Sequence, residues 1–356
     1  MNPNHFALIM AGGQGTRFWP WSIPAKPKQF LAVIGDQPLL TQTYQRLQRF
    51  IPRSNIFVIA DRCYLPAVRE CLNGFAEENF IAEPAPRNTA PALILANIVL
   101  SRRNPDASLL VAPSDHFISK EEVFAAQLGA ALEYASSGRL VTAGIMPDSP
   151  HTGYGYIHFS ARNADALGGT RFYPVLAFKE KPDRATARRY LKQKTYCWNS
   201  GMFVYTLRRF RELLSAYNPY YAEQYEALER CRNDTARFSE TFCAIKPDSI
   251  DYALLEKAKE VSMFKAAFAW NDVGSWSSVY DMSVKDTAGN VAKGEPILID
   301  AKDSLVVDAG DRPLALIGLR DIAVISTANG VLVAGREHLQ RVKEALEKLK
   351  QKPARK

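Results

Sequence analysis

Short apolar segments alternate with longer amphipathic ones through the first 270 residues. Runs of four or five apolar residues predict buried strands, whereas apolar positions three and four apart predict helices. Strands are expected at 6–10, 56–60, 109–112, 140–144, 156–159, 175–178 and 202–205, and the clearest helices at 90–103, 121–136, 185–193 and 207–217. This alternation predicts an α/β fold with a Rossmann-like, mixed, mostly parallel sheet flanked by helices.

The pattern changes beyond residue 285. Glycines there separate short β-rich segments at 296–299, 305–307, 314–317, 322–325 and 331–333, and a helix is expected at 337–350. Closely spaced short strands with turn residues between them predict a small all-β unit. We therefore expect a large α/β domain at 1–285, a small β-rich domain at 286–336, and a C-terminal helix with a basic tail at 337–356.

Composition narrows the class of protein. The chain has 356 residues, of which 47% are hydrophobic and 23% charged, as in ordinary globular proteins. No apolar stretch approaches the ~20 residues that span a bilayer, and the N-terminus lacks the pattern of a secretory signal. Five cysteines without a C-x-x-C pair argue against a zinc site or a disulfide framework. We therefore expect a cytoplasmic protein with no membrane partner.

The net charge of +8 is concentrated at the C-terminus. Seven basic and two acidic residues follow position 340, so five of the eight charges lie in this tail. The rest of the chain has no basic stripe interleaved with aromatic residues. We therefore expect no nucleic-acid partner.

A glycine-rich turn follows the first predicted strand. Its glycines are Gly12, Gly13 and Gly15, and the cations that flank it are Arg17 and Lys28. A turn without side chains lets backbone amides approach an anion closely, and permanent positive charge on both sides suits a polyphosphate. The alternative is a glycine-rich surface turn with incidental cations.

Two common phosphate loops do not match this turn. A Walker loop needs a Lys-Ser or Lys-Thr pair that is absent at the required spacing, and a dinucleotide fingerprint needs a glycine where Phe18 stands. The turn nevertheless lies at the carboxyl end of a predicted strand, where open α/β sheets bind ligands.

Two aspartates are candidate metal ligands. Asp115 follows the predicted strand at 109–112, and Asp272 precedes the glycine turn at Gly274. Mg²⁺ usually takes one or two carboxylates together with substrate phosphates. Each aspartate alone is equally typical of a cap or turn, but with the glycine turn the pair predicts a metal site. His116 is expected to be a neighbour and not a ligand.

Residues 11–30, AGGQGTRFWPWSIPAKPKQF, resemble the signature of sugar-phosphate nucleotidyltransferases, and in this wording that of mannose-1-phosphate guanylyltransferases. Further motifs follow in the family's order: EPxxRNTAPA at 83–92, GYGY at 153–156, FxEKP at 178–182, WNxGMF at 198–203, SIDY at 249–252 and WNDVGSW at 270–276. The resemblance implies the nucleotidyltransferase fold and a C-terminal left-handed β-helix-like domain that helps pair subunits in a homodimer. It also implies a short form with one activity, because longer relatives append a cupin-type phosphomannose isomerase domain.

The resemblance assigns roles to individual residues. The implied catalytic residues are Arg17, Lys28 and Asp115, and the implied Mg²⁺ ligands are Asp115 and Asp272. The implied nucleotide-binding residues are Ala11, Gly12, Gly13, Gly15, Thr16, Glu83, Asn88, Thr89 and Ser114, with the segment at 83–92 selecting guanine. The implied sugar-phosphate residues are Gly155, Glu180, Lys181 and Asn199.

Several of these residues also have plainer interpretations. Glu180 and Lys181 would by default form a surface ion pair. Asn88 or Thr89 could cap the helix that follows, and that role is compatible with nucleotide binding. Asp251 could equally cap a helix or contact a ligand.

The expected activity is transfer of GMP from GTP to alpha-D-mannose 1-phosphate, giving GDP-mannose and pyrophosphate by metal-assisted in-line attack. The acceptor phosphate supplies its own oxygen nucleophile, so no activated side chain is needed. Two alternatives stay open. One is a nucleotidyltransferase that uses another nucleoside triphosphate and glucose 1-phosphate, and the other is a non-catalytic regulatory protein that binds a sugar nucleotide.

Overall fold

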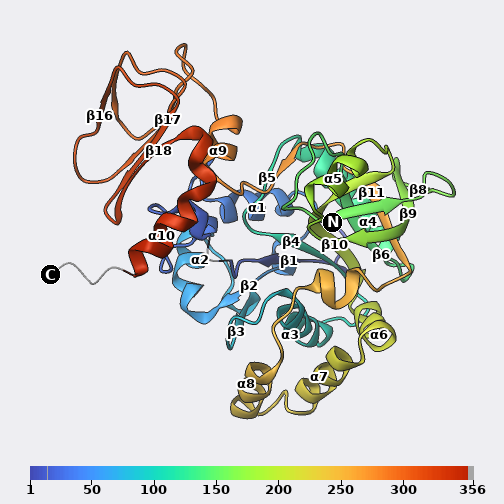
Figure 1. Ribbon diagram of the computed structural model, residues 1–356. Coiled ribbons are helices and arrows are strands. Elements are labelled where there is room, and N and C mark those ends of the chain that lie inside the picture. Colours follow the sequence, from blue (N-terminus) through green and yellow to red (C-terminus); the bar gives the residue numbers. More distant parts are fainter. Residues whose placement is uncertain (14, 352–356) are drawn as a thin grey trace.

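The computed structural model describes residues 1–13 and 15–351, and it places them in two units (Figure 1). The larger unit is built on a ten-stranded sheet, and the smaller β-rich unit lies beside it. Gln14 and the end of the basic tail, with Lys352, Arg355 and Lys356, lie outside the described residues. Within the described ranges, no helix combines the length and the apolar character needed to cross a bilayer.

The strand order in the large sheet is β3-β2-β1-β4-β10-β6-β11-β9-β7, with β8 paired to β9. The bounds are β1 His5–Met10, β2 Ile56–Asp61, β3 Phe80–Glu83, β4 Ser108–Pro113, β6 Leu140–Ile145, β7 Tyr156–Phe159, β8 Asp165–Leu167, β9 Thr170–Lys179, β10 Tyr196–Thr206 and β11 Val261–Lys265. All seven expected strands are present, and β9 and β10 extend well beyond the apolar runs that predicted them.

The sheet changes character at β10. Strands β1 to β4 pair in parallel, as does β6 with β11. Strand β10 runs antiparallel between β4 and β6, and β9 pairs antiparallel with β7 and β11. The α/β fold is confirmed, and its second half is more antiparallel than the alternation indicated. Local periodicity identifies a strand but does not determine where a later strand inserts.

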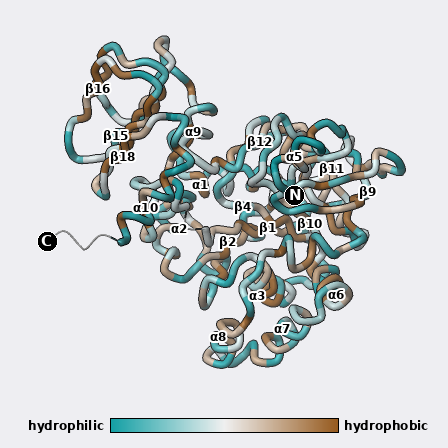
Figure 2. Tube along the Cα trace, viewed as in Figure 1, coloured by the Kyte–Doolittle hydropathy of each residue, from teal (hydrophilic) through white to brown (hydrophobic). Residues whose placement is uncertain are grey.

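Helices cover both faces of the sheet. Phe6 and Leu8 of β1 belong to one hydrophobic cluster, and Ala7 and Ile9 belong to another. The first cluster includes residues of α3 Thr89–Ser101, α6 Leu207–Tyr217, α7 Pro219–Arg230 and α8 Thr235–Ala244, and the second includes residues of α1 Leu39–Gln48, α2 Leu65–Cys71 and α4 Glu121–Ala135. Burial on both faces explains why the central strands are continuous apolar runs (Figure 2).

The expected helices correspond to α3, α4, α5 (Arg184–Leu191) and α6, and their ends differ from the prediction by at most two residues. Between the two units, β5 (Phe117–Ile118) pairs with β12 (Trp270–Asn271), and α9 (Trp276–Met282) follows. Strand β5 directly follows His116 and β12 directly precedes Asp272, so this pairing joins the two aspartate-bearing segments.

The C-terminal unit coils through two small parallel sheets. Val291 of β13 (Val291–Lys293) lies opposite Leu305 of β15 (Leu305–Ala309), which lies opposite Ala323 of β17 (Ile322–Thr327). The second sheet pairs β14 (Ile297–Ile299) with β16 (Ala315–Ile317), and β18 (Gly330–Gly335) turns back on β17. The expected last helix is divided into a 3-10 helix, η7 (Arg336–Arg341), and α10 (Val342–Lys350).

Candidate active site

The glycine turn (residues 11–18) leaves the carboxyl end of β1. The buried Gln29 side chain holds it, because its Nε2 donates to the carbonyl oxygens of Ala11 at 2.7 Å and Gly13 at 3.0 Å. Gly15 has a φ of 57°, and a Cβ there would lie 2.6 Å from the Cβ of Lys28. Only glycine fits this bend, which needs both a left-handed backbone and an empty side-chain position.

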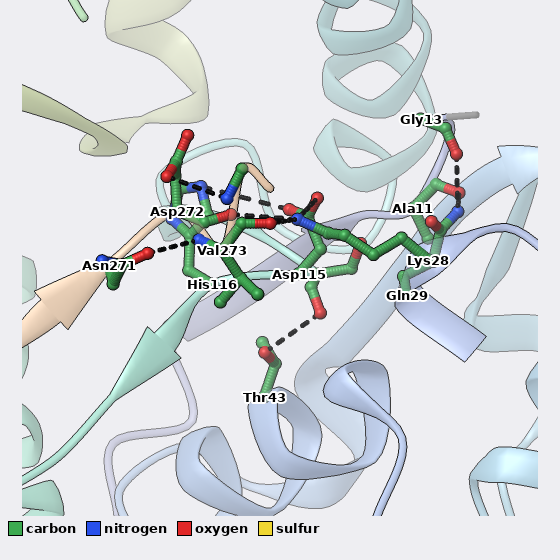
Figure 3. Close-up of polar contacts among 12 residues, drawn as sticks. Ala11, Gly13, Lys28, Gln29, Thr43, Asp115, His116, Asn271, Asp272 and Val273 are labelled. Carbon is green, nitrogen blue, oxygen red and sulfur yellow. Dashed lines mark hydrogen bonds and ion pairs between the residues drawn. The ribbon is translucent and has the colours of Figure 1, made fainter. Parts of the chain in front are cut away.

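Lys28 joins the two aspartate-bearing segments. Its Nζ lies 2.7 Å from Oδ2 of Asp115 and donates to the backbone oxygens of Asp272 at 2.9 Å and Val273 at 3.0 Å (Figure 3). Lys28 comes from the 3-10 helix η2 (Lys28–Phe30) and is buried. The structure therefore brings Asp115 and Asp272 to one ammonium group beside the glycine turn.

The two carboxylates are held from different sides. Burial raises the pKa of Asp115, but the charge of Lys28 and the His116 ring overcome it and hold the pKa below its usual value. Oδ1 of Asp272 accepts hydrogen bonds from the Tyr154 hydroxyl at 2.8 Å and from the Gly274 amide at 3.1 Å. Burial and the charge of Asp272 raise the pKa of Tyr154, so this tyrosine stays a protonated donor.

The donor set of this pair fits a magnesium ion. Lys28 binds Oδ2 of Asp115, Nε2 of His116 lies 4.0 Å from Oδ1 of Asp115, and Tyr154 and Gly274 donate to Oδ1 of Asp272. Within the described residues, no group of three or more His, Cys, Asp or Glu side chains is arranged to hold a metal. Two hard oxygen ligands, completed by substrate phosphates and water, are what Mg²⁺ requires. The Nδ1 of His116 accepts a hydrogen bond from the Trp270 indole at 3.1 Å.

A cavity of about 350 Å³ lies beside Asp115, whereas Asp272 does not line it. Its walls include Gly12, Gly13, Gln29, Glu83, Asn88, Thr89, Ser114, Asp115 and Asp251. Six of the predicted nucleotide-binding residues therefore meet around one space, at the carboxyl ends of β1, β3 and β4. Ala11, Gly15 and Thr16 belong to the same turn but do not line this cavity.

Glu83 and the start of α3 form one wall of the cavity. The side chain of Glu83 is 8% exposed, and burial together with the Asp61 charge raises the pKa of Glu83 to about 7. A Cβ on Gly12 would lie 3.1 Å from Oε1 of Glu83, so this carboxyl faces the glycine turn. The Asn88 side chain accepts from the Thr89 amide at 2.8 Å, which confirms its role as a helix cap.

The predicted sugar-phosphate residues also lie together. Lys181 Nζ lies 2.7 Å from Oε1 of Glu180, and a Cβ on Gly155 would lie 2.5 Å from Oε2 of the same carboxylate. Asn199 donates from Nδ2 to Oδ1 of Asp251 at 3.0 Å, and its backbone amide donates to the Gly155 oxygen at 2.8 Å. Four elements, β7, β9, β10 and the π-helix at Asp251–Leu255, supply or flank this cluster.

Three residues outside the predicted set contribute to the site. Gln29 holds the glycine turn, Tyr154 bonds Asp272, and Asp251 lies between the cavity and the sugar-phosphate cluster. Burial and the Glu180 charge raise the pKa of Asp251 to about 6. The sequence signals for them were the PKQF, GYGY and SIDY motifs, but the partners of each side chain come from distant segments.

Arg17 is an exposed cation beside the glycine turn, as Lys181 is in the sugar-phosphate cluster. Arg17 lies on the 3-10 helix η1 (Thr16–Phe18), and its charge lowers the pKa of Tyr154, against the larger opposing effects of burial and Asp272. The site therefore combines a glycine turn, exposed positive charge, two aspartates and an acid-lined cavity. These parts suit the transfer of a phosphoryl group between two anions.

Comparison with known proteins agrees with this chemistry. Residues 6–289 match the family model described as nucleotidyl transferase, and residues 294–349 match that described as MannoseP isomerase/GMP-like beta-helix domain. The chain is therefore a nucleotidyltransferase that carries a C-terminal β-helix domain.

Relatives define the family more narrowly. A solved structure from Thermus thermophilus, described as a mannose-1-phosphate geranyltransferase, has a TM-score of 0.86 and 30% identity and covers 98% of this chain and 99% of its own. XanB, a xanthan biosynthesis protein of Xanthomonas campestris pv. campestris (strain B100), is 38% identical over 96% of this chain and 73% of its own length. The mannose-1-phosphate guanylyltransferase of Escherichia coli (strain K12) is 37% identical over 97% of this chain and 73% of its own length. The chain belongs to the mannose-1-phosphate guanylyltransferase family, which confirms the predicted resemblance.

Proposed function

We propose that this enzyme transfers GMP from GTP to alpha-D-mannose 1-phosphate, giving GDP-mannose and pyrophosphate. One observation carries the proposal: Lys28 contacts both Asp115 and the backbone of Asp272. These contacts lie beside the glycine turn and the cavity that Glu83 lines. The substrates follow from the activity named for the relatives.

The reaction joins two anions, so its barrier is mainly electrostatic. An oxygen of the sugar phosphate attacks the α-phosphorus of GTP, and the bond to the bridging oxygen breaks as pyrophosphate leaves. Arg17 and the amides of the glycine turn would balance the charge of the departing pyrophosphate, and Lys181 would hold the attacking phosphate. Glu180 and Asn199 would orient the sugar through its hydroxyl groups, with the small Gly155 leaving room for it.

We assign the metal site to Asp115 and Asp272, and Mg²⁺ as the metal. When bound, the ion supplies positive charge that reduces repulsion between the reacting phosphates. Lys28 contributes by fixing the Asp115 carboxylate and the backbone beside Asp272 in one arrangement.

Glu83 gives a physical reason for guanine. An ionised carboxylate only accepts hydrogen bonds, and the Watson–Crick edge of guanine offers two neighbouring donors, N1–H and the N2 amino group. Adenine presents an acceptor at N1, which an ionised carboxylate would repel. The pKa of about 7 means that Glu83 can be ionised near neutral pH.

A pyrophosphate-release assay tests the proposal by crossing four nucleoside triphosphates with mannose 1-phosphate and glucose 1-phosphate. We expect GTP with mannose 1-phosphate to give the highest kcat/KM. A preference for another nucleotide with glucose 1-phosphate would replace the assignment by the related transferase. Binding of GDP-mannose without release of pyrophosphate from any pair would identify a sugar-nucleotide-binding regulatory protein instead.

We further propose a homodimer that works in the cytoplasm. Ile297, Ile299 and Ile317 are about half exposed on the β14–β16 sheet, an apolar surface that favours pairing with a second copy. The five cysteines are free thiols, as suits a reducing compartment. We place the catalytic domain at 1–285, the β-rich domain at 286–336, and the C-terminal helix and tail at 337–356.

A further inference from the structure

The glycine turn and the segment that follows Asp272, here called the two catalytic segments, share a hydrophobic core with the C-terminal unit. Phe18 ends the glycine turn, and Val273 and Trp276 follow Asp272; all three are buried in one cluster. The β-rich unit supplies the opposite side of that cluster through Val291, Leu305, Val307, Ala323, Ile325 and Leu332. The Phe18 and Trp276 rings are 5.0 Å apart, centroid to centroid. The backs of both catalytic segments therefore rest on the C-terminal domain.

Polar contacts hold the segment that follows Phe18. Oγ1 of Thr327, at the end of β17, lies 3.2 Å from the backbone oxygen of Pro20 and also 3.2 Å from that of Gly330. The Trp276 indole donates to the Trp19 oxygen at 3.4 Å. Gly330, at the start of β18, faces the Trp19 ring, and a Cβ there would lie 3.1 Å from Cζ2 of the indole. The β17–β18 hairpin therefore grips the chain only two to three residues beyond Arg17.

Residues near the C-terminus also pack between the C-terminal unit and the two catalytic segments. Helix α10 packs against the 3-10 helix η1, which carries Arg17, and its residue Val342 belongs to the shared cluster. Gln340 Nε2 donates to Oγ of Ser275, the residue that caps α9. In Figure 1, α10 runs between the β-rich unit and the larger domain.

The sugar-phosphate side lacks this support. Within the described chain, the shared cluster contains no residue of β9 or β10, the strands that lead to Glu180 and carry Asn199. A change in the β17–β18 hairpin, which contacts Trp19 and Pro20, should therefore reach the pyrophosphate side of the site and spare the sugar side.

We propose that the C-terminal β-helix domain is a working part of the active site: Thr327, Gly330 and Trp276 act as positioning residues that hold residues 18–21, and through them Arg17, against the departing pyrophosphate. The proposal rests on the role proposed above for Arg17. A positioning contact remote from the chemistry matters because small displacements of catalytic groups cost large factors in rate.

Thr327→Val removes the hydroxyl, with its bond to Pro20 and its bonds to Asn329 and Gly330 inside the turn, and keeps the shape of the side chain. We expect kcat/KM for GTP to fall about tenfold and KM for mannose 1-phosphate to stay within about twofold of wild type. Thr327→Ser keeps the hydroxyl and should retain wild-type values. The proposal would be overturned if Thr327→Val impaired the use of GTP and of mannose 1-phosphate equally, or if Thr327→Ser had the same defect as Thr327→Val.

Hydrogen exchange gives a readout that does not depend on activity. The amides of Phe18, Trp21 and Ser22 bond within the turn, to the oxygens of Gly15 and Phe18. In Thr327→Val these amides should exchange faster, whereas amides of β9 and β10 should not change. Unchanged exchange in the turn would refute the proposal even if the enzyme acts on other substrates. Conversely, faster exchange in an enzyme with different substrates would refute only the proposed function.

A double-mutant cycle distinguishes an effect of the contact between Gly330 and Trp19 from local damage to the β17–β18 hairpin. Gly330→Ala adds a Cβ against Trp19 at a φ of 147°, so both the contact and the strained backbone should lower kcat/KM for GTP. Trp19→Phe makes room for the Cβ and relieves only the contact. If the two residues act through their contact, the double variant should recover part of the loss. Strictly additive losses would show that Gly330 serves only its own turn and would count against the proposal.

Discussion

Lys28 is the residue whose surroundings differ most from what its position in the sequence indicates. The motif predicts a cation that flanks a phosphate turn, whereas the structure buries the ammonium among Asp115 and the backbone of Asp272 and Val273. Two of these partners are 244 and 245 positions away in the chain. Motifs supplied the candidate site residues, but local sequence cannot predict contacts across such separations.

Asp115→Asn tests the metal assignment at the residue scale. The amide keeps the shape of the side chain and removes the charge that would hold a cation, so kcat should fall by at least ~10²-fold. Asp106→Asn is a matched control, because Asp106 is an exposed aspartate paired with Arg208. Near-normal turnover of Asp115→Asn in Mg²⁺ would contradict the assignment.

Glu83 should make nucleotide use depend on pH. Because its pKa is about 7, protonation below that pH turns one of its two acceptor oxygens into a donor, so guanine loses one partner. The kcat/KM for GTP should therefore fall about tenfold per pH unit on the acid side. Glu83→Gln should have a lower kcat/KM without this slope. A slope that persists in the variant would assign the titration to another group.

The same carboxyl should also affect stability. The pKa of Glu83 in the folded protein lies above its ordinary value of 4.5, so the folded state binds more protons between these two values. Its contribution to stability is therefore greatest below pH 4.5 and is lost as the pH rises through 7, by up to about 3 kcal/mol. Denaturant unfolding of Glu83→Gln between pH 5 and 8 should show a correspondingly smaller fall in the free energy of unfolding.

At the scale of elements, apolar periodicity predicted the strands and the main helices because burial determines both. It did not predict the antiparallel insertion of β10 or the start of β9 at Thr170, five residues before the apolar run at 175–178. Tertiary pairing determines these features. The π-helix at Asp251–Leu255 brings Asp251 to Asn199, a contact that the SIDY motif alone does not specify.

Gly155 tests how closely two of these elements must approach. A Cβ at this position would lie 2.5 Å from the Glu180 carboxylate, so Gly155→Ala should displace that carboxylate and raise KM for mannose 1-phosphate about tenfold. KM for GTP should be unchanged. Gly129→Ala is the control, because a Cβ at Gly129 of α4 meets no atom within 4 Å. Equal effects of both variants would contradict the proposed sugar contact.

At the scale of the whole molecule, the two units share a hydrophobic cluster, and the C-terminal unit also has an exposed apolar face. Ile297 is 55% exposed, Ile299 48% and Ile317 63%, all on the β14–β16 sheet. Ile317→Asp should convert the proposed dimer into a monomer, as measured by light scattering after gel filtration. Leu176→Asp is a control on β9, where Leu176 is 59% exposed. A dimer that survives Ile317→Asp would place the interface elsewhere.

The burial of the Lys28 ammonium beside Asp115 also bears on how the fold depends on divalent ions. Close carboxylates without a counter-charge repel each other, and in many metalloproteins the ion itself relieves that repulsion and drives folding. Here an amino acid already supplies positive charge, so the architecture is complete before any ion arrives. Treatment with a chelator should accordingly abolish turnover yet leave the melting temperature unaltered, which separates the supply of metal from the integrity of the protein.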